Sequence, residues 1–243
     1  MKKQLFIIII IALSTNIFSQ VYIGARAGLN MSTSSVMPEL VNYDKLSQFV
    51  PKLGLNAGLV VKYRFIDAMA VQLEINYSGK GLKAKVDEMV NDTALTGKWN
   101  YSFGYIEVPL MFKYLFGGSR VGPFVEAGAY YGYFLTGKFS EYGEFDGKEI
   151  LNNEFELETD YEDENDNQKA NRNEYGFKLG LGYNFEIDDS MIFVALRYSQ
   201  GLTDIVTYRT KPDDYSKTYN RTFQIAVGYL FELGSEKEKE YWY

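Results

Sequence analysis

In several segments of this 243-residue chain, large apolar residues alternate with small, polar or charged ones, and the charged residues of both signs fall in the second phase. Side chains with a period of two share one face of a strand. Opposite charges brought together in a protein interior form ion pairs, and a carboxylate among them could act as a general acid or base. The candidate interior ion-pair network comprises Arg26, Lys62, Arg64, Glu74, Glu107, Lys113, Glu126, Lys178, Glu186 and Arg197.

The chain contains neither histidine nor cysteine. This composition excludes a Ser–His nucleophile pair, a thiol nucleophile, imidazole or thiolate metal ligands, and disulfides. Carboxylates remain, but those expected in the interior lie beside Arg or Lys, which favours a structural role over general acid catalysis. We therefore expect no catalytic residues, no cofactor and no enzymatic activity.

The segment 141–174 holds thirteen acidic and three basic residues, whereas the whole chain has a net charge of only −7. A block of like charge is typical of a solvated, mobile loop. Four residues in it match positions one, three, five and twelve of a calcium-binding loop, but Gln168 stands where the sharp turn requires glycine, which argues against a metal site. These weak candidate ligands are Asp163, Asn165, Asn167 and Glu174.

The elements that would position the charged residues are long two-faced strands. In segments 53–65 and 69–77, large apolar residues alternate with small or charged ones, and the short break between them predicts a hairpin. Six further segments repeat the pattern. The predicted strands are about 21–30, 53–65, 69–77, 101–115, 124–136, 175–187, 192–199 and 222–231.

These strands exceed the roughly 5–6 residues usual in globular proteins and match the about 9–11 that a tilted strand needs to cross a bilayer. Outer-membrane barrels combine an even strand number with short periplasmic turns and long extracellular loops. We therefore predict an all-β fold, an eight-stranded antiparallel up-and-down transmembrane β-barrel with periplasmic N- and C-termini; a soluble barrel or sandwich is the alternative. The connections alternate between short (66–68, 116–120, 188–190) and long (31–51, 79–100, 137–174, 203–217).

The chain begins with the layout of a secretory signal peptide. Met1-Lys2-Lys3 is basic, 5–13 is apolar and 14–20 is small and polar, and the apolar run is shorter than the roughly 20 residues of a transmembrane helix. We predict a cleaved signal peptide at 1–19, the barrel domain at 20–233 and a charged, aromatic tail at 234–243.

The interior of an eight-stranded barrel is only wide enough for its own side chains. With the apolar phase facing lipid, the charged phase should pair inside and leave a plugged lumen, while interior glycines make room for longer neighbours. A narrow ion-conducting path lined by the same groups is the alternative. A change of parity at Tyr101 and Phe103 further suggests a bulge near 104–106, where Pro109 also fits poorly into a regular ladder.

Several short motifs follow one another along the predicted strands. They are Gly28-Leu29-Asn30, Glu74 with Tyr77 and Lys80-Gly81, Tyr105-Ile106-Glu107-Val108-Pro109-Leu110 with Lys113, Gly180 and Gly182, Arg197-Tyr198 with Gly201-Leu202, and Gly228-Tyr229 with Phe231. In this order and spacing they make the chain similar to the PorT-like outer-membrane β-barrel family of Bacteroidota. The resemblance implies an eight-stranded, porin-like outer-membrane barrel. The role of the best-known member in type IX secretion is not implied for the whole family.

Together these observations predict a monomeric, integral outer-membrane protein with a structural or adaptor role, acting through its long extracellular loops. The expected partners are outer-membrane lipid and lipopolysaccharide, together with envelope or secretion proteins. Nucleic-acid binding is not expected, because the chain is acidic and has no basic patch with interleaved aromatic residues. A narrow porin-like channel for ions or small solutes is the alternative function.

Overall fold

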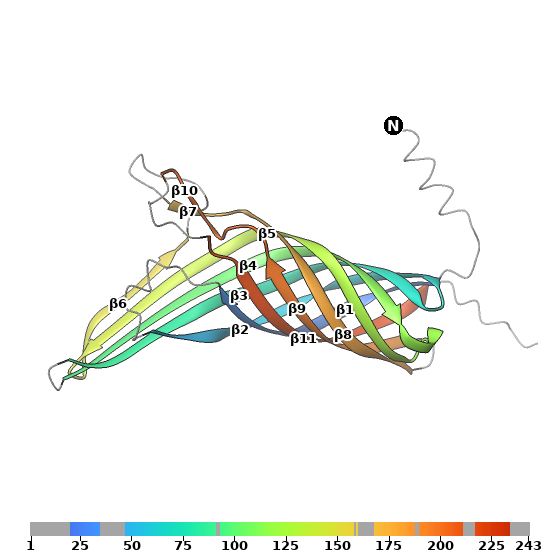
Figure 1. The fold of residues 1–243 in the computed structure, drawn as a ribbon, viewed down its shortest axis with the longest axis horizontal. Helices are drawn as coiled ribbons and strands as arrows, with labels where there is room; N and C mark the ends of the chain where they lie inside the picture. The colour runs from blue at the N-terminus through green and yellow to red at the C-terminus, as the bar shows by residue number, and fades with distance from the viewer. Residues whose placement is uncertain are drawn as a thin grey trace, which may run out of the picture.

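The computed structural model describes residues 20–34, 47–90, 93–157, 159, 168–187, 190–210 and 217–233. Almost all of them form β-strands (Figure 1). Within these ranges no helix has the length and apolar character needed to cross a membrane. The predicted signal peptide at 1–19 and the predicted tail at 234–243 lie outside the described residues.

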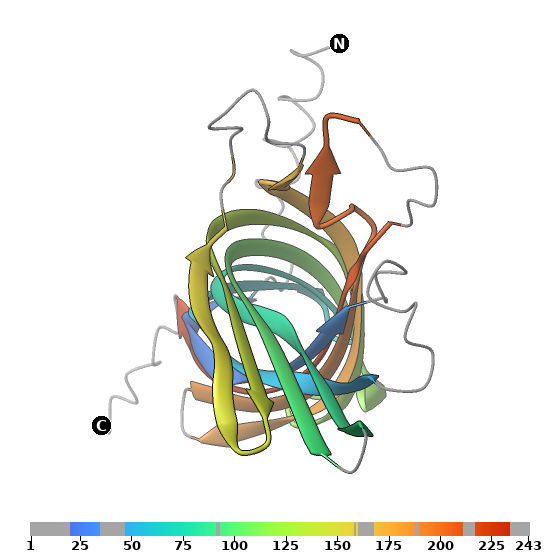
Figure 2. The same ribbon diagram turned by 90° about the vertical axis from the view of Figure 1, so that its left-hand side faces the viewer.

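Eight antiparallel strands close into a ring, in the order β1-β2-β3-β4-β5-β8-β9-β11, with β11 pairing back onto β1. Figure 2 looks towards one end of this ring. The predicted up-and-down barrel is therefore confirmed. The strands are β1 Gln20–Ser34, β2 Ser47–Ile66, β3 Met69–Val90, β4 Thr93–Leu115, β5 Gly122–Phe145, β8 Asn173–Ile187, β9 Ser190–Gly201 and β11 Asn220–Leu233.

At one end of the ring, β2 to β5 continue and are joined by β6 (Lys148–Glu156), which pairs with β5. These strands form a long curved sheet that projects to the left in Figure 1, here called the extension. Beside it, β7 (Gln168–Ala170) and β10 (Val206–Tyr208) form a separate two-stranded sheet. At the other end the connections are short, including the 3-10 turn η2 (Phe116–Gly118).

Two of the predicted loops are therefore partly wrong. Strands β3 and β4 stay paired out to Val90 and Thr93, inside the predicted loop 79–100. Strand β5 runs to Phe145 and β6 follows, inside the acidic segment predicted as a mobile loop. The period of two persists in both places, but the outward face becomes charged, so the alternation of apolar with polar residues weakens.

The extension has two open edges, each interrupted. Strand β6 pairs on one side only, and its register with β5 shifts between Gly143 and Glu144, which leaves Ile150 as an extra residue. The first residues of β2, from Ser47 to Pro51, pair with β3 but not with β1, and they end in a proline. Both interruptions remove regularly spaced hydrogen-bonding groups from an exposed strand.

The two phases of the ring strands face opposite sides, as predicted. Leu55 and Leu181 are 67% and 57% exposed on the exterior. Lys62, Glu74 and Lys178 are at most 2% exposed in the interior. The exterior of the ring is therefore apolar and its interior is charged, the reverse of a soluble barrel.

The predicted irregularity in β4 lies on its neighbour. Strand β4 keeps one phase, with Phe103 and Tyr105 buried on the same face as Glu107. The register shift opposite Gly104 and Tyr105 instead leaves Leu135 of β5 as the extra residue. The apolar residues of β4 change phase in the sequence because the interior-facing positions become aromatic at Phe103 and Tyr105, not because the strand is irregular. The β3–β4 ladder also skips the pairs between Leu73↔Leu110 and Asn76↔Glu107, where Pro109 has no N–H to donate.

Candidate functional site in the barrel interior

The middle of the ring holds a chain of ion pairs centred on Glu74 of β3. Its carboxylate lies 2.5 Å from Arg26 Nη1 of β1 and 2.8 Å from Arg197 Nη2 of β9. Arg197 also pairs with Glu126 of β5, whose other oxygen lies 3.2 Å from Lys113 Nζ of β4. The side chains in this cluster are at most 1% exposed, so one connected network links five strands through the interior.

A second cluster lies nearer the extension and is centred on two carboxylates. Glu107 of β4 is 2.6 Å from the ammonium groups of both Lys178 and Lys80. Lys80 also pairs with Glu174 at 3.0 Å. Tyr130 Oη donates a hydrogen bond to Glu174 at 2.7 Å, so that all four charges are held by neighbours from different strands.

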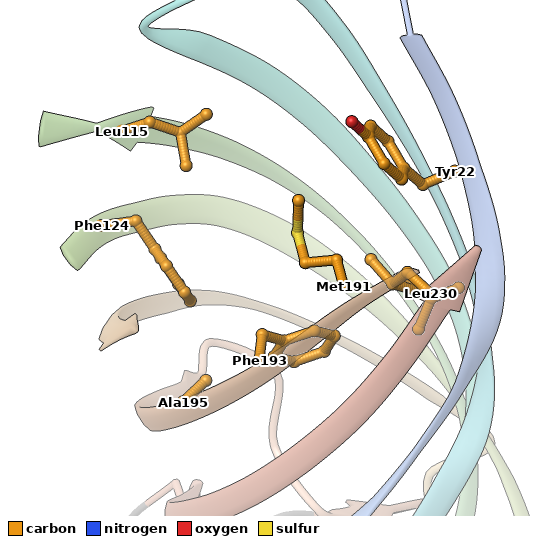
Figure 3. Packing of buried hydrophobic residues seen from close by; sticks show 8 residues of the cluster. Tyr22, Leu115, Phe124, Met191, Phe193, Ala195 and Leu230 are labelled. Atoms are coloured by element: carbon orange, nitrogen blue, oxygen red, sulfur yellow. The ribbon is translucent and has the colours of Figure 1, made fainter. Parts of the chain in front are cut away.

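Apolar side chains form a cluster in the interior at the end with short turns. Figure 3 shows Leu115 of β4, Phe124 of β5, Met191 and Phe193 of β9, and Leu230 of β11 in this cluster. The cluster also includes Tyr22, Val60 and Ala195.

A second apolar cluster lies at the opposite end, where Ile205 from the β9–β11 connection packs against Phe103, Tyr105 and Phe134. The connection is held there by hydrogen bonds from the amide of Ile205 to the carbonyl of Thr218 and from the amide of Asn171 to the carbonyl of Ile205. The ion pairs therefore lie between two apolar layers.

Interior glycines leave the room that these side chains occupy. A Cβ added at Gly228 would lie 2.2 Å from Cε1 of Phe193. One added at Gly180 would lie 2.9 Å from both Cγ of Arg197 and Oε1 of Glu126. Small residues on one strand thus admit large or charged ones from its neighbours, as the sequence predicts.

Three predicted members of the network lie elsewhere. Glu186 is exposed at the end of β8, where it pairs with Arg120, so its assignment to the interior is wrong. Arg64 lies at the short-turn end and pairs with Asp67. Lys62 is buried, but among the described residues no carboxylate lies within ion-pair distance of it. Its Nζ instead lies 3.3 Å from Met191 Sδ.

Sequence reasoning missed Lys80 and assigned Glu174 to a metal loop. Lys80 stands an even number of residues after Glu74 on β3, and Glu174 an even number before Lys178 on β8. Both side chains therefore face the interior, and this period of two was the signal that could have found them. The pairing of Glu174 inside the barrel contradicts its proposed role as a surface ligand. Asp163, Asn165 and Asn167 lie outside the described residues. Within the described ranges, no three acidic side chains are grouped closely enough to hold a metal ion.

A comparison with known protein families identifies the family of this chain. The family described as "Outer membrane protein beta-barrel domain" matches residues 15–207. The chain belongs to this family. It is therefore an outer-membrane β-barrel protein, and its apolar exterior faces lipid. A comparison with curated proteins found no match.

Several solved structures are similar to this outer-membrane barrel. OprG from Pseudomonas aeruginosa is 14% identical, with 88% of this chain and 95% of that one covered and a TM-score of 0.45. Ail of Yersinia pestis, solved with a heparin analogue, is 13% identical, with 87% and 99% covered and a TM-score of 0.36. Neisserial surface protein A is 11% identical, with 86% and 95% covered and a TM-score of 0.38.

The apolar exterior of the barrel has the height of a membrane. On β3 it runs from Met69 to Tyr77, and on β4 from Tyr114 back to Ile106, which matches the about 9–11 residues of a tilted spanning strand. Beyond it the outward residues of β3 become Lys83 and Lys85. The extension therefore lies outside the hydrocarbon layer, while the ion pairs centred on Glu74 lie within the membrane-spanning part.

Charges of opposite sign neutralise each other in the barrel interior. Each of the four central carboxylates faces at least one ammonium or guanidinium group, and no serine or threonine nucleophile is hydrogen-bonded to any of them in the described part of the chain. A buried ion pair contributes little net stability, but removing one member leaves a costly unpaired charge. The two clusters of ion pairs can thus together hold six strands, β1, β3, β4, β5, β8 and β9, in one register.

Proposed function

We propose that the protein is a non-catalytic, PorT-like outer-membrane scaffold whose closed barrel holds the extension at the cell surface. The observation that carries this proposal is the layered interior. Ion pairs centred on Glu74 and Glu107 lie between an apolar cluster around Phe193 and another around Ile205. Ions would have to break these contacts to pass, because the side chains themselves occupy the interior.

The lengths of the connections support an orientation with periplasmic termini. In outer-membrane barrels short turns face the periplasm and long segments face outward. Strands β1 and β11 meet at Val21↔Leu233 at the short-turn end, on the same side as η2. In this orientation the extension, β7 and β10 face the cell exterior. The motifs that resemble the PorT-like family of Bacteroidota run along the ring strands and are consistent with the same orientation.

The extension supports the adaptor part of the proposal. Its two faces differ, because Tyr101, Phe139 and Phe155 stack across β4, β5 and β6 on one face, while lysines occupy the other. A large surface of this kind, held on a rigid barrel, suits contacts with other components of the envelope, including lipopolysaccharide and envelope or secretion proteins. The barrel itself would act as a monomer.

Planar-bilayer recording of the refolded protein tests the proposal. A closed barrel should give no stable conductance steps, whereas a narrow porin-like channel for ions or small solutes should give steps of uniform size. The excess of buried cations, seven against four carboxylates, favours anion selectivity if such steps appear. Heat-modifiable mobility on a denaturing gel should first establish that the barrel is folded in the same preparation. Uniform steps from a folded sample would contradict the scaffold proposal.

A further inference from the structure

A groove of about 300 Å³ crosses the outer surface of β2 to β5, where the apolar exterior meets the extension. Its membrane side is formed by Leu53, Leu55 and Tyr77, which are 69%, 67% and 43% exposed. Gly104 lies in its floor, and a Cβ there would be 3.0 Å from Tyr77 Oη. The groove thus begins on the surface that faces acyl chains and is open because glycine leaves it empty.

The opposite side of the groove is polar and cationic. Lys52 Nζ donates a hydrogen bond to Asn100 Oδ1 at 2.7 Å and contacts Ser102 Oγ. Its stem crosses Gly81, where a Cβ would lie 2.8 Å from Lys52 Cδ. This glycine has φ +149°, a conformation that other residues rarely adopt. The backbone is therefore shaped to hold one lysine across the outer face of the sheet.

Lys138 provides a second cation on the same side. Its Nζ donates a hydrogen bond to Glu154 Oε1 at 2.8 Å, and this carboxylate raises the pKa of Lys138. The ammonium group is therefore protonated at neutral pH. Both members of this pair are more than half exposed, so an anion can reach the lysine from solvent.

More lysines continue the charge along the outward face. Lys85 and Lys98 are paired directly across β3 and β4, and Lys83 is the next outward residue on β3. Like charges placed opposite each other on neighbouring strands are destabilising. An anion held beside them would offset this repulsion. On this outward face Glu154 and Glu156 lie beside Lys138, against five lysines: Lys52, Lys83, Lys85, Lys98 and Lys138. Positive charge therefore predominates just above the apolar surface, although the whole chain is acidic.

We propose that the groove binds the phosphate of a phosphorylated glycolipid of the outer leaflet, such as the lipid A part of lipopolysaccharide. The phosphate would contact Lys52 and Lys138, and the acyl chains would lie on Leu53 and Leu55. Lipid phosphates lie at the depth where the hydrocarbon layer ends, and lysines at this depth attract them. This inference rests on the proposed orientation, which places the groove in the outer leaflet.

Lipid binding by native mass spectrometry of the full-length protein tests the inference. The probes are bis-phosphorylated lipid A and the same lipid after removal of both phosphates. Each lysine near a bilayer surface contributes about five-fold in affinity, so the double substitution Lys52→Gln and Lys138→Gln should weaken binding of the phosphorylated probe about 25-fold. Lys148→Gln, an exposed lysine at the tip of the extension, is the matched control and should change binding less than two-fold.

The charge-preserving pair Lys52→Arg and Lys138→Arg should retain the affinity. Equal binding of the two lipids, or an unchanged affinity in the double glutamine variant, would overturn the inference. Displacement of the lipid by an equal concentration of inorganic phosphate would also overturn it, since the site would then be specific for free phosphate. Conductance steps would contradict the closed scaffold but leave the lipid result intact, and gel mobility confirms that each variant is folded.

Discussion

Replacing Glu74 with Gln should destabilise the folded barrel by about 3–5 kcal/mol, because it leaves buried guanidinium groups without their shared anion. Glu74 accepts hydrogen bonds from Arg26 Nη1 at 2.5 Å and from Arg197 Nη1 and Nη2 at 2.9 and 2.8 Å. Arg197 keeps Glu126 as a partner in the variant, whereas Arg26 keeps only neutral amides. Most of the loss in the free energy of unfolding should therefore come from Arg26, whose charge is left without a carboxylate partner.

The free energy of unfolding can be measured in phospholipid vesicles by urea titration, with the folded fraction scored by heat-modifiable gel mobility. Glu154→Gln is the matched control, because Glu154 pairs with Lys138 in solvent and such pairs contribute at most about 1 kcal/mol. Adding Arg26→Gln to Glu74→Gln should recover at least about 1 kcal/mol relative to the sum of the single changes.

A loss of less than about 1 kcal/mol for Glu74→Gln would refute this reasoning. It would mean that water solvates the two guanidinium groups in place of the carboxylate at little cost in free energy. The centre of the barrel would then be hydrated. Additive single changes would likewise show that Arg26 and Glu74 do not depend on each other. Either result would also remove the main support for a closed interior.

Four further substitutions, in three predictions, test the packing and the membrane assignment. Gly228→Leu should cost about 3 kcal/mol or more, because its Cβ would lie 2.2 Å from Cε1 of Phe193; an unchanged urea midpoint would contradict this packing. Leu181→Lys on the exterior should cost about 2–4 kcal/mol in vesicles, while Ile150→Lys in the extension should cost less than about 0.5 kcal/mol, and equal effects would argue against the membrane boundary. Ile205→Ala should cost about 2–5 kcal/mol and speed amide hydrogen exchange in the β9–β11 connection but not in the ring, and unchanged exchange would show that Ile205 does not hold the connection.

The ring could be predicted from the sequence because one physical signal runs through it. Residues such as Leu55 and Lys62 alternate between lipid and interior, and the alternation marks each spanning strand and assigns its faces. The same parity correctly placed Glu74, Glu107 and Lys178 in the interior. It could not say which cation meets which carboxylate, because that depends on the register between strands distant in the sequence.

The period of two does not identify interior residues correctly where the surroundings of a strand change along its length. Glu186 has the interior parity of Lys178 but lies at the strand end, where the chain emerges and Arg120 is available. Lys80 was missed for the opposite reason, because β3 continues beyond the apolar exterior. Glu174 was missed because it is the second residue of β8 and directly follows the acidic segment in the sequence. Once the outward residues are polar, as at Lys83, the contrast that marks a strand is lost although the backbone pairing continues.

The interrupted borders of the extension bear on how the molecule avoids self-association. A flat strand with free N–H and C=O groups is a template for another chain, and crowded surface proteins meet many copies of themselves. Pro51 withholds a donor at one border, and the extra Ile150 offsets the spacing at the other. Two small irregularities can thus prevent the long, exposed sheet from pairing edge to edge with the sheets of neighbouring molecules.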